Sequence, residues 1–157
     1  APPPSPSPES HELTGVVLRL RRALRASVRT DIPWESLPMA QVELLQTLAE
    51  LPPIRVGDLA DRLHLANSTV SGLVGQMMDA GLVARHTDRL DRRAASVAVT
   101  EAGRARLAEW ERAHERRIGT ALDQLPAANR TSVVKALPAL RRLAEILSSE
   151  REDGAGG

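Results

Sequence analysis

The residues best suited to chemistry lie in one stretch of the chain, between Arg55 and Gly103. Within it, a helical pattern over 67–80 places small hydrogen-bonding side chains and glycines on one side. This outer face consists of Ser68, Thr69, Ser71, Gly72, Gly75 and Gln76. A slim face with few charges and several hydroxyl or amide groups suits a helix that enters the major groove of DNA and meets base edges.

Two glycines on that face, Gly72 and Gly75, indicate that another molecule approaches the helix closely. Glycine inside a helix costs roughly 0.5–1 kcal/mol relative to alanine, so its presence needs a reason. Two alternatives stay open at this point. The helix could simply carry weak residues on its surface, or a second helix could pack closely through the glycines.

A basic loop follows this helix. Residues 85–93 read RHTDRLDRR and separate two short segments, 82–84 and 96–99, that are predicted strands of a hairpin. The candidate DNA-binding residues of this wing are Arg85, Arg89, Asp91, Arg92 and Arg93. An arginine at a narrow hairpin tip can reach the minor groove of DNA. The alternative is a solvated tip whose ion pairs contribute little, but beside a helix-turn-helix we favour the DNA interpretation.

The remaining chain supplies helices that would position this stretch. Apolar residues at helical spacing predict helices over 10–30, 39–51, 56–63, 67–80, 101–125 and from 127 onward. The predicted fold is therefore mainly α with a small β wing: a winged helix-turn-helix with six helices. The predicted N-caps are Ser10, Asn67 or Ser68, and Thr100. Gly81 should end the fourth helix in a left-handed conformation, and Pro138 should kink or split the last helix.

We expect a single domain over 10–150, between a Pro/Ser-rich disordered tail at 1–9 and a second disordered tail at 151–157. Within it, 38–100 is the predicted DNA-binding lobe, and 10–37 and 101–148 hold dimerisation helices. Apolar residues from Leu107 to Leu125 recur at alternating three- and four-residue steps, like a coiled-coil seam. This seam and the last helix carry more apolar surface than a small winged-helix core can cover. A second copy is the natural cover, so a symmetric homodimer is expected.

Composition excludes several classes of protein. The 157 residues include no Cys, Phe or Tyr and only two Trp. Disulfides, thiol switches and thiolate metal ligation are therefore ruled out, and a platform of base-stacking aromatics is disfavoured. The four His form no close helical pair, so no metal and no cofactor are expected. No apolar run is long enough to cross a membrane and no signal pattern opens the chain, so the cytoplasm is the default location.

Charge is informative through its distribution. The formal net charge is only +1, yet 20 of the 21 basic residues are Arg, since Lys135 is the one lysine. The guanidinium fork suits phosphate and base edges, although a high-GC coding bias explains the same excess equally well. One side of the first helix carries Arg19, Arg21, Arg22, Arg25 and Arg29. A solvated face is the favoured interpretation there, with an anion site as the alternative.

An enzyme is disfavoured. His64 and Ser68 are four residues apart and could suggest a base and a nucleophile. They straddle a predicted turn, however, and no third group orients the histidine. No glycine-rich phosphate loop or metal-ligand set accompanies them.

The ordered set of motifs resembles the MarR family of bacterial winged-helix transcriptional regulators. The residues from Asp91-Arg92-Arg93 to Val99-Thr100 and Gly103 fit its Asp-x-Arg … Leu-Thr-x-x-Gly signature in spacing, with Val99 where Leu is usual. Further matches are Leu59-Ala60, the STVS run at 68–71, and Gly81-Leu82-Val83 with Arg85. Leu37-Pro38-x-x-Gln41 is similar to the opening of the family's second helix, although Pro38 replaces its usual capping Thr or Ser.

The resemblance implies a homodimer that binds a near-palindromic operator. Helix 67–80 would enter the major groove, where Ser68, Thr69, Ser71 and Gln76 would face bases or phosphates. Arg92 would enter the minor groove, while Asp91 and Arg93 would brace the wing and touch phosphate. It also implies a repressor that a small anionic or phenolic ligand releases, and the residues that would line its cleft are Trp34, Arg22, Arg29 and Trp110. The alternative is a winged-helix module that binds proteins and not DNA.

Overall fold

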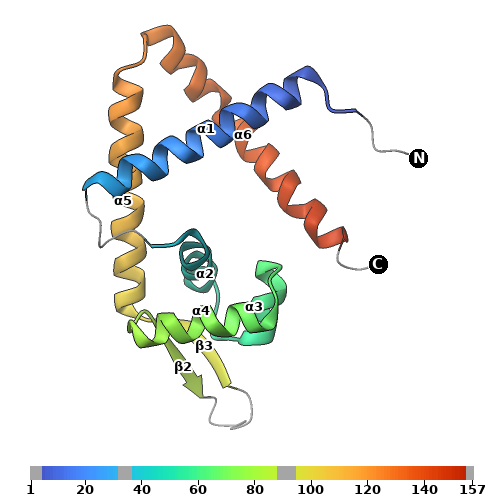
Figure 1. Cartoon of the computed structure of the whole chain (residues 1–157), viewed down its shortest axis with the longest axis vertical. Coiled ribbons are helices and arrows are strands. Elements are labelled where there is room, and N and C mark those ends of the chain that lie inside the picture. Colours follow the sequence, from blue (N-terminus) through green and yellow to red (C-terminus); the bar gives the residue numbers. More distant parts are fainter. Residues whose placement is uncertain (1–4, 32–36, 88–94, 155–157) are drawn as a thin grey trace. The chain divides into compact units, whose positions relative to one another are not determined.

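The structure is a computed structural model that describes residues 5–31, 37–87 and 95–154, with side chains described over 5–27, 37–87 and 95–149. The chain divides into two compact units, Ala1–Glu115 and Arg116–Gly157. Figure 1 shows the helices and strands, all labelled except β1. They are α1 (Pro8–Asp31), α2 (Met39–Glu50), β1 (Ile54–Arg55), α3 (Val56–Leu63), α4 (Asn67–Asp79), β2 (Val83–Thr87), β3 (Ala95–Val99), α5 (Glu101–Asp123) and α6 (Ala127–Gly154). This is the predicted mainly α winged helix-turn-helix.

Helix α2 forms the centre of the core in the first unit. Its Val42, Leu44, Leu45 and Leu48 are at most 1% exposed. The buried residues that surround them are Leu59, Ala60, Val70, Val74, Met77, Val83, Val97 and Leu107. A single apolar stripe at helical spacing predicts Val42, Leu45 and Leu48 but not Leu44. Leu44 is buried because α2 is contacted both by α4 and by β3, so its buried face is wider than one stripe.

The small sheet has three strands, in the order β1-β3-β2, and not the two that were predicted. Both neighbours run antiparallel to β3, with Ile54 opposite Val97 and Val83 opposite Val99. The sequence did not reveal β1 because two residues after a Pro-Pro pair are too few to show alternation.

Two predicted ends of helices were wrong. Helix α1 begins at Pro8 and is capped by Ser7, whose Oγ accepts a hydrogen bond from the Ser10 backbone N–H at 3.2 Å. Ser10 is therefore not the cap, and the predicted tail at 1–9 is wrong for Pro8 and Glu9. A proline at the first helical position loses nothing, because its missing N–H would have no helical partner there.

The C-terminal helix also differs from its prediction. Helix α6 continues to Gly154, so the predicted tail at 151–157 is wrong for residues 151–154. It runs through Pro138 without splitting. The ring removes one hydrogen bond, to the carbonyl of Val134, which a long helix tolerates on an exposed surface.

Neither α1 nor the second unit has a core of its own. None of the described side chains at 8–27 is buried, and the same holds for those at 116–149. The exposed large apolar residues of these parts are Leu13, Val16, Val17, Leu18, Leu20, Ile118, Leu125, Val133, Val134, Leu137, Leu140, Leu143, Ile146 and Leu147. Over the described ranges, no helix combines the length and apolar character that a membrane span needs.

Gly103, in the first turn of α5, is buried and closely packed. A Cβ there would overlap the carbonyl oxygen of Leu82 and lie 2.8 Å from Cγ2 of Val99. Both neighbours belong to the ends of the wing, so α5 approaches the sheet as closely as it does only because residue 103 is glycine.

We therefore expect Gly103→Ala to lower the free energy of unfolding by about 1–3 kcal/mol, as overpacked sites do. Gly119→Ala is the matched control on the same helix, because nothing lies within 4 Å of its Cβ position. That change should raise stability by about 0.5–1 kcal/mol. Denaturant unfolding followed by circular dichroism measures both, and equal effects of the two substitutions would contradict the packing argument.

Candidate nucleic-acid interface

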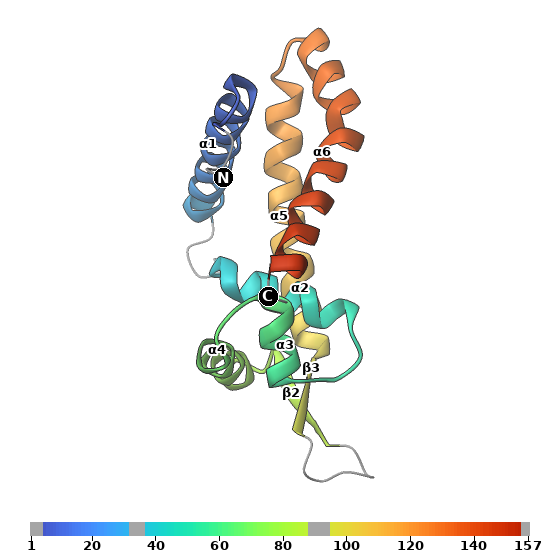
Figure 2. The same cartoon turned by 90° about the vertical axis from the view of Figure 1, so that its right-hand side faces the viewer.

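The outer face of α4 is open to solvent. Ser68, Thr69, Ser71, Gly72 and Gln76 are exposed and Gly75 is half-buried, while Val70, Val74 and Met77 on the opposite side are buried. Figure 2 shows α4 nearly end-on beside α3, with β2 and β3 extending from the same lobe. One side of the helix therefore packs into the core, and the other side is exposed to solvent.

No side chain caps the start of α4. Its N-cap is Ala66, in an extended conformation, and the first helical hydrogen bond joins the Val70 N–H to the Ala66 carbonyl at 3.1 Å. The predicted caps, Asn67 and Ser68, are the first two residues inside the helix, so that prediction was wrong. The first N–H groups of such a helix lack helical partners and carry the positive end of its dipole.

The turn before α4 contains a left-handed residue that is not glycine. His64 has φ 52° and ψ 43°, and it closes α3 with its own N–H bonded to the Asp61 carbonyl at 3.2 Å. The Leu65 N–H bonds to the Ala60 carbonyl at 3.0 Å. These bonds close the C-terminus of α3 in a backbone conformation that is disfavoured for a residue with a Cβ.

The end of α4 is held more firmly than its start. Gly81 has φ +75°, as predicted, and the N–H groups of Gly81 and Leu82 bond to the carbonyls of Met78 and Met77 at 3.0 and 2.9 Å. This pattern is a Schellman motif, which satisfies the last carbonyls of a helix.

Thr100 joins this end of α4 to the start of α5. Its Oγ1 donates to the Gly81 carbonyl at 2.7 Å and accepts from the Gly103 N–H at 3.0 Å, which confirms Thr100 as the predicted N-cap. Its backbone N–H also bonds to the Leu82 carbonyl at 3.0 Å. The two ends of the wing and two helix termini therefore meet at one residue.

Gln76, on the outer face, has a partner on another helix. The Nε2 of Gln41, in α2, lies 3.3 Å from the Oε1 of Gln76 and donates a hydrogen bond to it. Sequence reasoning placed Gln76 among the DNA-binding residues but did not connect it to Gln41. No local signal could have done so, because the two residues are 35 positions apart.

The glycines of the outer face are not required by packing inside the chain. A Cβ at Gly72 or at Gly75 would meet nothing within 4 Å. Among the described residues, close helix–helix packing therefore does not account for them. The two possibilities that remain are a weak surface helix and the approach of another molecule.

The wing is described only at its base. Arg85 is exposed on β2, directly opposite Val97 of β3, and so lies on the face of the sheet that carries the buried Val83 and Val97. This face packs against the helices of the lobe. The other predicted wing residues, Arg89, Asp91, Arg92 and Arg93, lie outside the described residues.

Of the candidate ligand-binding residues, the described side chains are those of Trp110 and Arg22. Trp110 of α5 is half-buried against the winged-helix core, and its ring lies 3.8 Å from that of His114. The His114 Nδ1 is 2.8 Å from the Trp110 carbonyl oxygen. Arg22 is exposed on α1, while Trp34 and the side chain of Arg29 lie outside the described residues.

Comparison with known proteins shows what this winged-helix lobe is similar to. The sequence profile of the MarR family matches residues 37–95, which hold the winged-helix lobe. A MarR family protein from Bacillus stearothermophilus has the same fold, with 25% identity, a TM-score of 0.69, and coverage of 88% of this chain and 94% of that one. By this match, residues 37–95 form a MarR-type domain. No match was found among the curated proteins searched.

Two further solved structures share the MarR fold at lower identity. FabT of Streptococcus pneumoniae, solved in complex with DNA, is 17% identical with a TM-score of 0.62 and covers 87% of this chain and 95% of its own. BpsR of Bordetella bronchiseptica, whose DNA binding is regulated by 6-hydroxynicotinic acid, is 24% identical with a TM-score of 0.57 and covers 87% and 98%. At these identities the likeness shows the fold.

We expect Gly72→Ala to raise the free energy of unfolding by about 0.5–1 kcal/mol, because the new methyl meets no neighbour and the helix gains propensity. Thermal or denaturant unfolding measures this. A loss of stability would show that packing within the chain, and not the approach of another molecule, requires glycine at this position.

Proposed function

We propose that the chain is a sequence-specific regulator of transcription that binds double-stranded DNA and has no enzymatic activity. In this proposal α4 is the recognition helix in the major groove, and the wing reaches the flanking minor groove. The single observation that carries it is the outer face of α4: small, hydrogen-bonding and uncharged from Ser68 to Gln76, on a helix whose other side is anchored in the core.

The major groove of B-DNA admits one α-helix and displays donors and acceptors at every base pair. Hydroxyl groups of Ser68, Thr69 and Ser71 and the amide of Gln76 can meet these edges or nearby phosphates. The uncapped N–H groups at the start of α4 favour a phosphate there. Gly72 and Gly75 let the helix backbone approach the bases.

The wing supplies most of the positive charge in this proposal, since the outer face carries none. Arg92 enters the minor groove, Asp91 and Arg93 brace the loop and touch phosphate, and Arg85 and Arg89 add phosphate contacts. Minor-groove arginines gain most over A·T-rich sequence, where the groove is narrow and the potential most negative.

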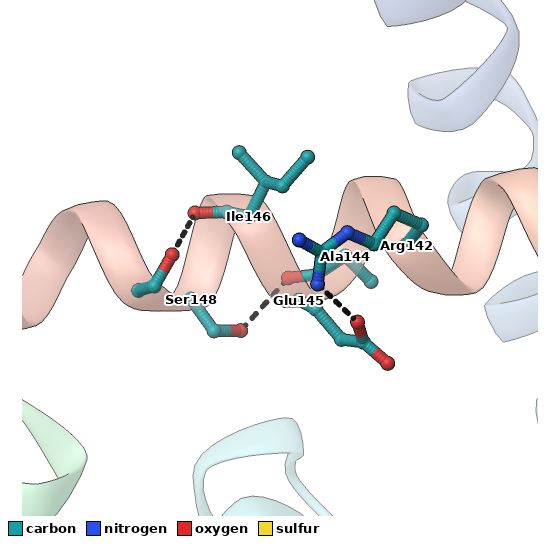
Figure 3. A network of polar contacts seen from close by, with 6 residues as sticks. Arg142, Ala144, Glu145, Ile146 and Ser148 are labelled. Atoms are coloured by element: carbon teal, nitrogen blue, oxygen red, sulfur yellow. Dashed lines mark hydrogen bonds and ion pairs between the residues drawn. The ribbon is translucent and has the colours of Figure 1, made fainter.

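We further propose a homodimer formed by α1, α5 and α6. The apolar residues of α1 and α6 are not buried in the chain by itself. On α6, Arg130 pairs with Asp123 of α5 at 2.9 Å, while the side-chain hydrogen bonds of Ser132 and Ser148 stay within the helix. Arg142 pairs with Glu145 at 3.0 Å, and Figure 3 shows Ile146 directed away from that pair. When a second copy covers this surface, two-fold symmetry relates the α4 helices of the two copies. A symmetric pair of recognition helices matches a near-palindromic operator.

The regulator is proposed to repress its own or adjacent genes and to be released by a small anionic or phenolic ligand. Support comes from BpsR, a structural relative whose DNA binding is regulated by such an acid. Trp110, Trp34, Arg22 and Arg29 are the residues proposed to line that site. Cytoplasmic location follows from the role.

The main experiment measures binding to the DNA upstream of the gene that encodes this chain, by fluorescence anisotropy over a range of salt. Affinity should fall steeply with salt, because each neutralised phosphate releases counterions. Arg92→Ala should weaken binding by about 1–3 kcal/mol for each DNA contact that it removes, and it should flatten the salt dependence. Arg112→Ala, an exposed arginine of α5, is the matched control and should bind normally.

An affinity that does not change with salt concentration would favour a protein-interaction module over a DNA-binding regulator. Normal binding by Arg92→Ala together with a steep salt dependence would leave the function standing and overturn the role of the wing tip.

The same Gly72→Ala variant that should be more stable is expected to bind DNA less well, by about 1–3 kcal/mol, because its methyl group occupies the space a base edge needs. The opposite signs of the two effects separate this role from a folding defect. Unchanged affinity would mean that Gly72 is simply a weak residue on a surface helix.

For the dimer, we expect Leu140→Glu to give a monomer by light scattering, because a carboxylate would be buried in the apolar interface. Arg141→Glu changes charge at the next position of α6 and is the control. A wild-type monomer at micromolar concentration would contradict the proposed assembly.

A further inference from the structure

Gln41 occupies the third position of α2, where a glutamine side chain ordinarily bonds back to the N–H of the N-cap residue. Here the N-cap is Pro38, which has no N–H to offer. The Pro38 carbonyl still accepts the N–H groups of Gln41 and Val42 at 2.9 and 3.1 Å, and no side chain caps the helix. The start of α2 is therefore ordered while the Gln41 amide is left without its usual local partner.

The freed amide reaches across to α4. Its Nε2 donates to the Oε1 of Gln76 at 3.3 Å, and this is a contact between two packed helices of one lobe. Gln41 is half-buried, whereas Gln76 is exposed on the outer face. The half-buried Gln41 side chain thus bonds to the exposed Gln76 side chain. In this arrangement Gln41 orients the amide of Gln76.

We propose that Gln41 is a positioning residue that determines which base edge Gln76 reads, an inference that rests on the proposed DNA-binding function. With its oxygen turned to Gln41, the Gln76 amide presents its two N–H donors outward. In the major groove, guanine offers two neighbouring acceptors, N7 and O6. Adenine offers an acceptor beside a donor, and a glutamine reads both only when its oxygen also faces the base. The oriented Gln76 therefore prefers guanine to adenine.

The inference deepens the role of Gln76 without adding a second site. It also gives a function to Pro38. A residue with an N–H at this position would compete for the Gln41 side chain and release the Gln76 amide to rotate.

The test is selection of bound duplexes from a pool with a random core, followed by competition binding with the selected sequence carrying each base at the position that depends on Gln76. That position is the one whose preference Gln76→Ala removes. We expect wild-type protein to favour guanine over adenine there by about tenfold.

Gln41→Glu is the decisive variant, because a carboxylate only accepts and must be met by the Gln76 N–H groups. The amide then turns its oxygen outward, and the guanine preference should fall about tenfold or pass to adenine. Gln46→Glu adds the same charge to an exposed position of α2 and should keep the preference. A general loss of affinity from added charge or from poorer folding affects all four bases alike, so the ratio isolates the orientation.

Pro38→Ser restores the N–H at the N-cap and should lower the guanine preference toward the value for Gln76→Ala. An unchanged preference in both Gln41→Glu and Pro38→Ser would overturn the inference while leaving the DNA-binding function intact. If wild-type protein enriches no sequence at all, the proposed function fails, and this inference with it.

Discussion

The lobe depends on a set of hydrogen bonds centred on Thr100. Its hydroxyl bonds to the last turn after α4 and to the first turn of α5, and its backbone N–H bonds to the residue that precedes β2. The wing begins and ends at this point, because Val83 and Val99 are paired across it. Gly103 makes the approach possible, since any side chain there would strike the Leu82 carbonyl. A shift of α4 relative to the wing would therefore break several bonds at once, so these bonds fix the geometry of the lobe.

The outer face of α4 and the turn before it contain residues that local stability does not favour. Gly72 and Gly75 weaken a helix in which nothing opposes a larger side chain, and His64 holds a left-handed conformation that glycine would adopt more easily. The core residues of α4 and α3, in contrast, are ones that packing favours, since Val70 and Leu59 are fully buried. Within one lobe, then, the anchored side is well packed, whereas the open side carries residues that the proposed contact with DNA would explain and local stability does not.

The sequence predicted most helices well, because their apolar residues repeat with the helical period over several turns. Its errors cluster where few residues carry the signal. Strand β1 has only two residues, and Leu44 is buried by a second neighbour that periodicity cannot show. Cap assignments at Ser10, Asn67 and Ser68 were one to three residues late, because a cap depends on backbone conformation and neighbouring residues of similar type compete for it. Thr100 and Gly81 were assigned correctly, since each stands alone at a sharp change of pattern.

By itself the sequence determined the winged-helix class, the outer face of α4 and the basic wing, because each is written in the spacing of residues near one another in the chain. It also carried the family motifs. Only the tertiary structure decided how these parts act on one another: the bond between Thr100 and Gly81 spans 19 positions, and the one between Gln41 and Gln76 spans 35. Such contacts depend on how α2, α4 and α5 pack in three dimensions. Local periodicity does not encode that packing, so the contacts made by Thr100 and Gln41 are visible only in the tertiary structure.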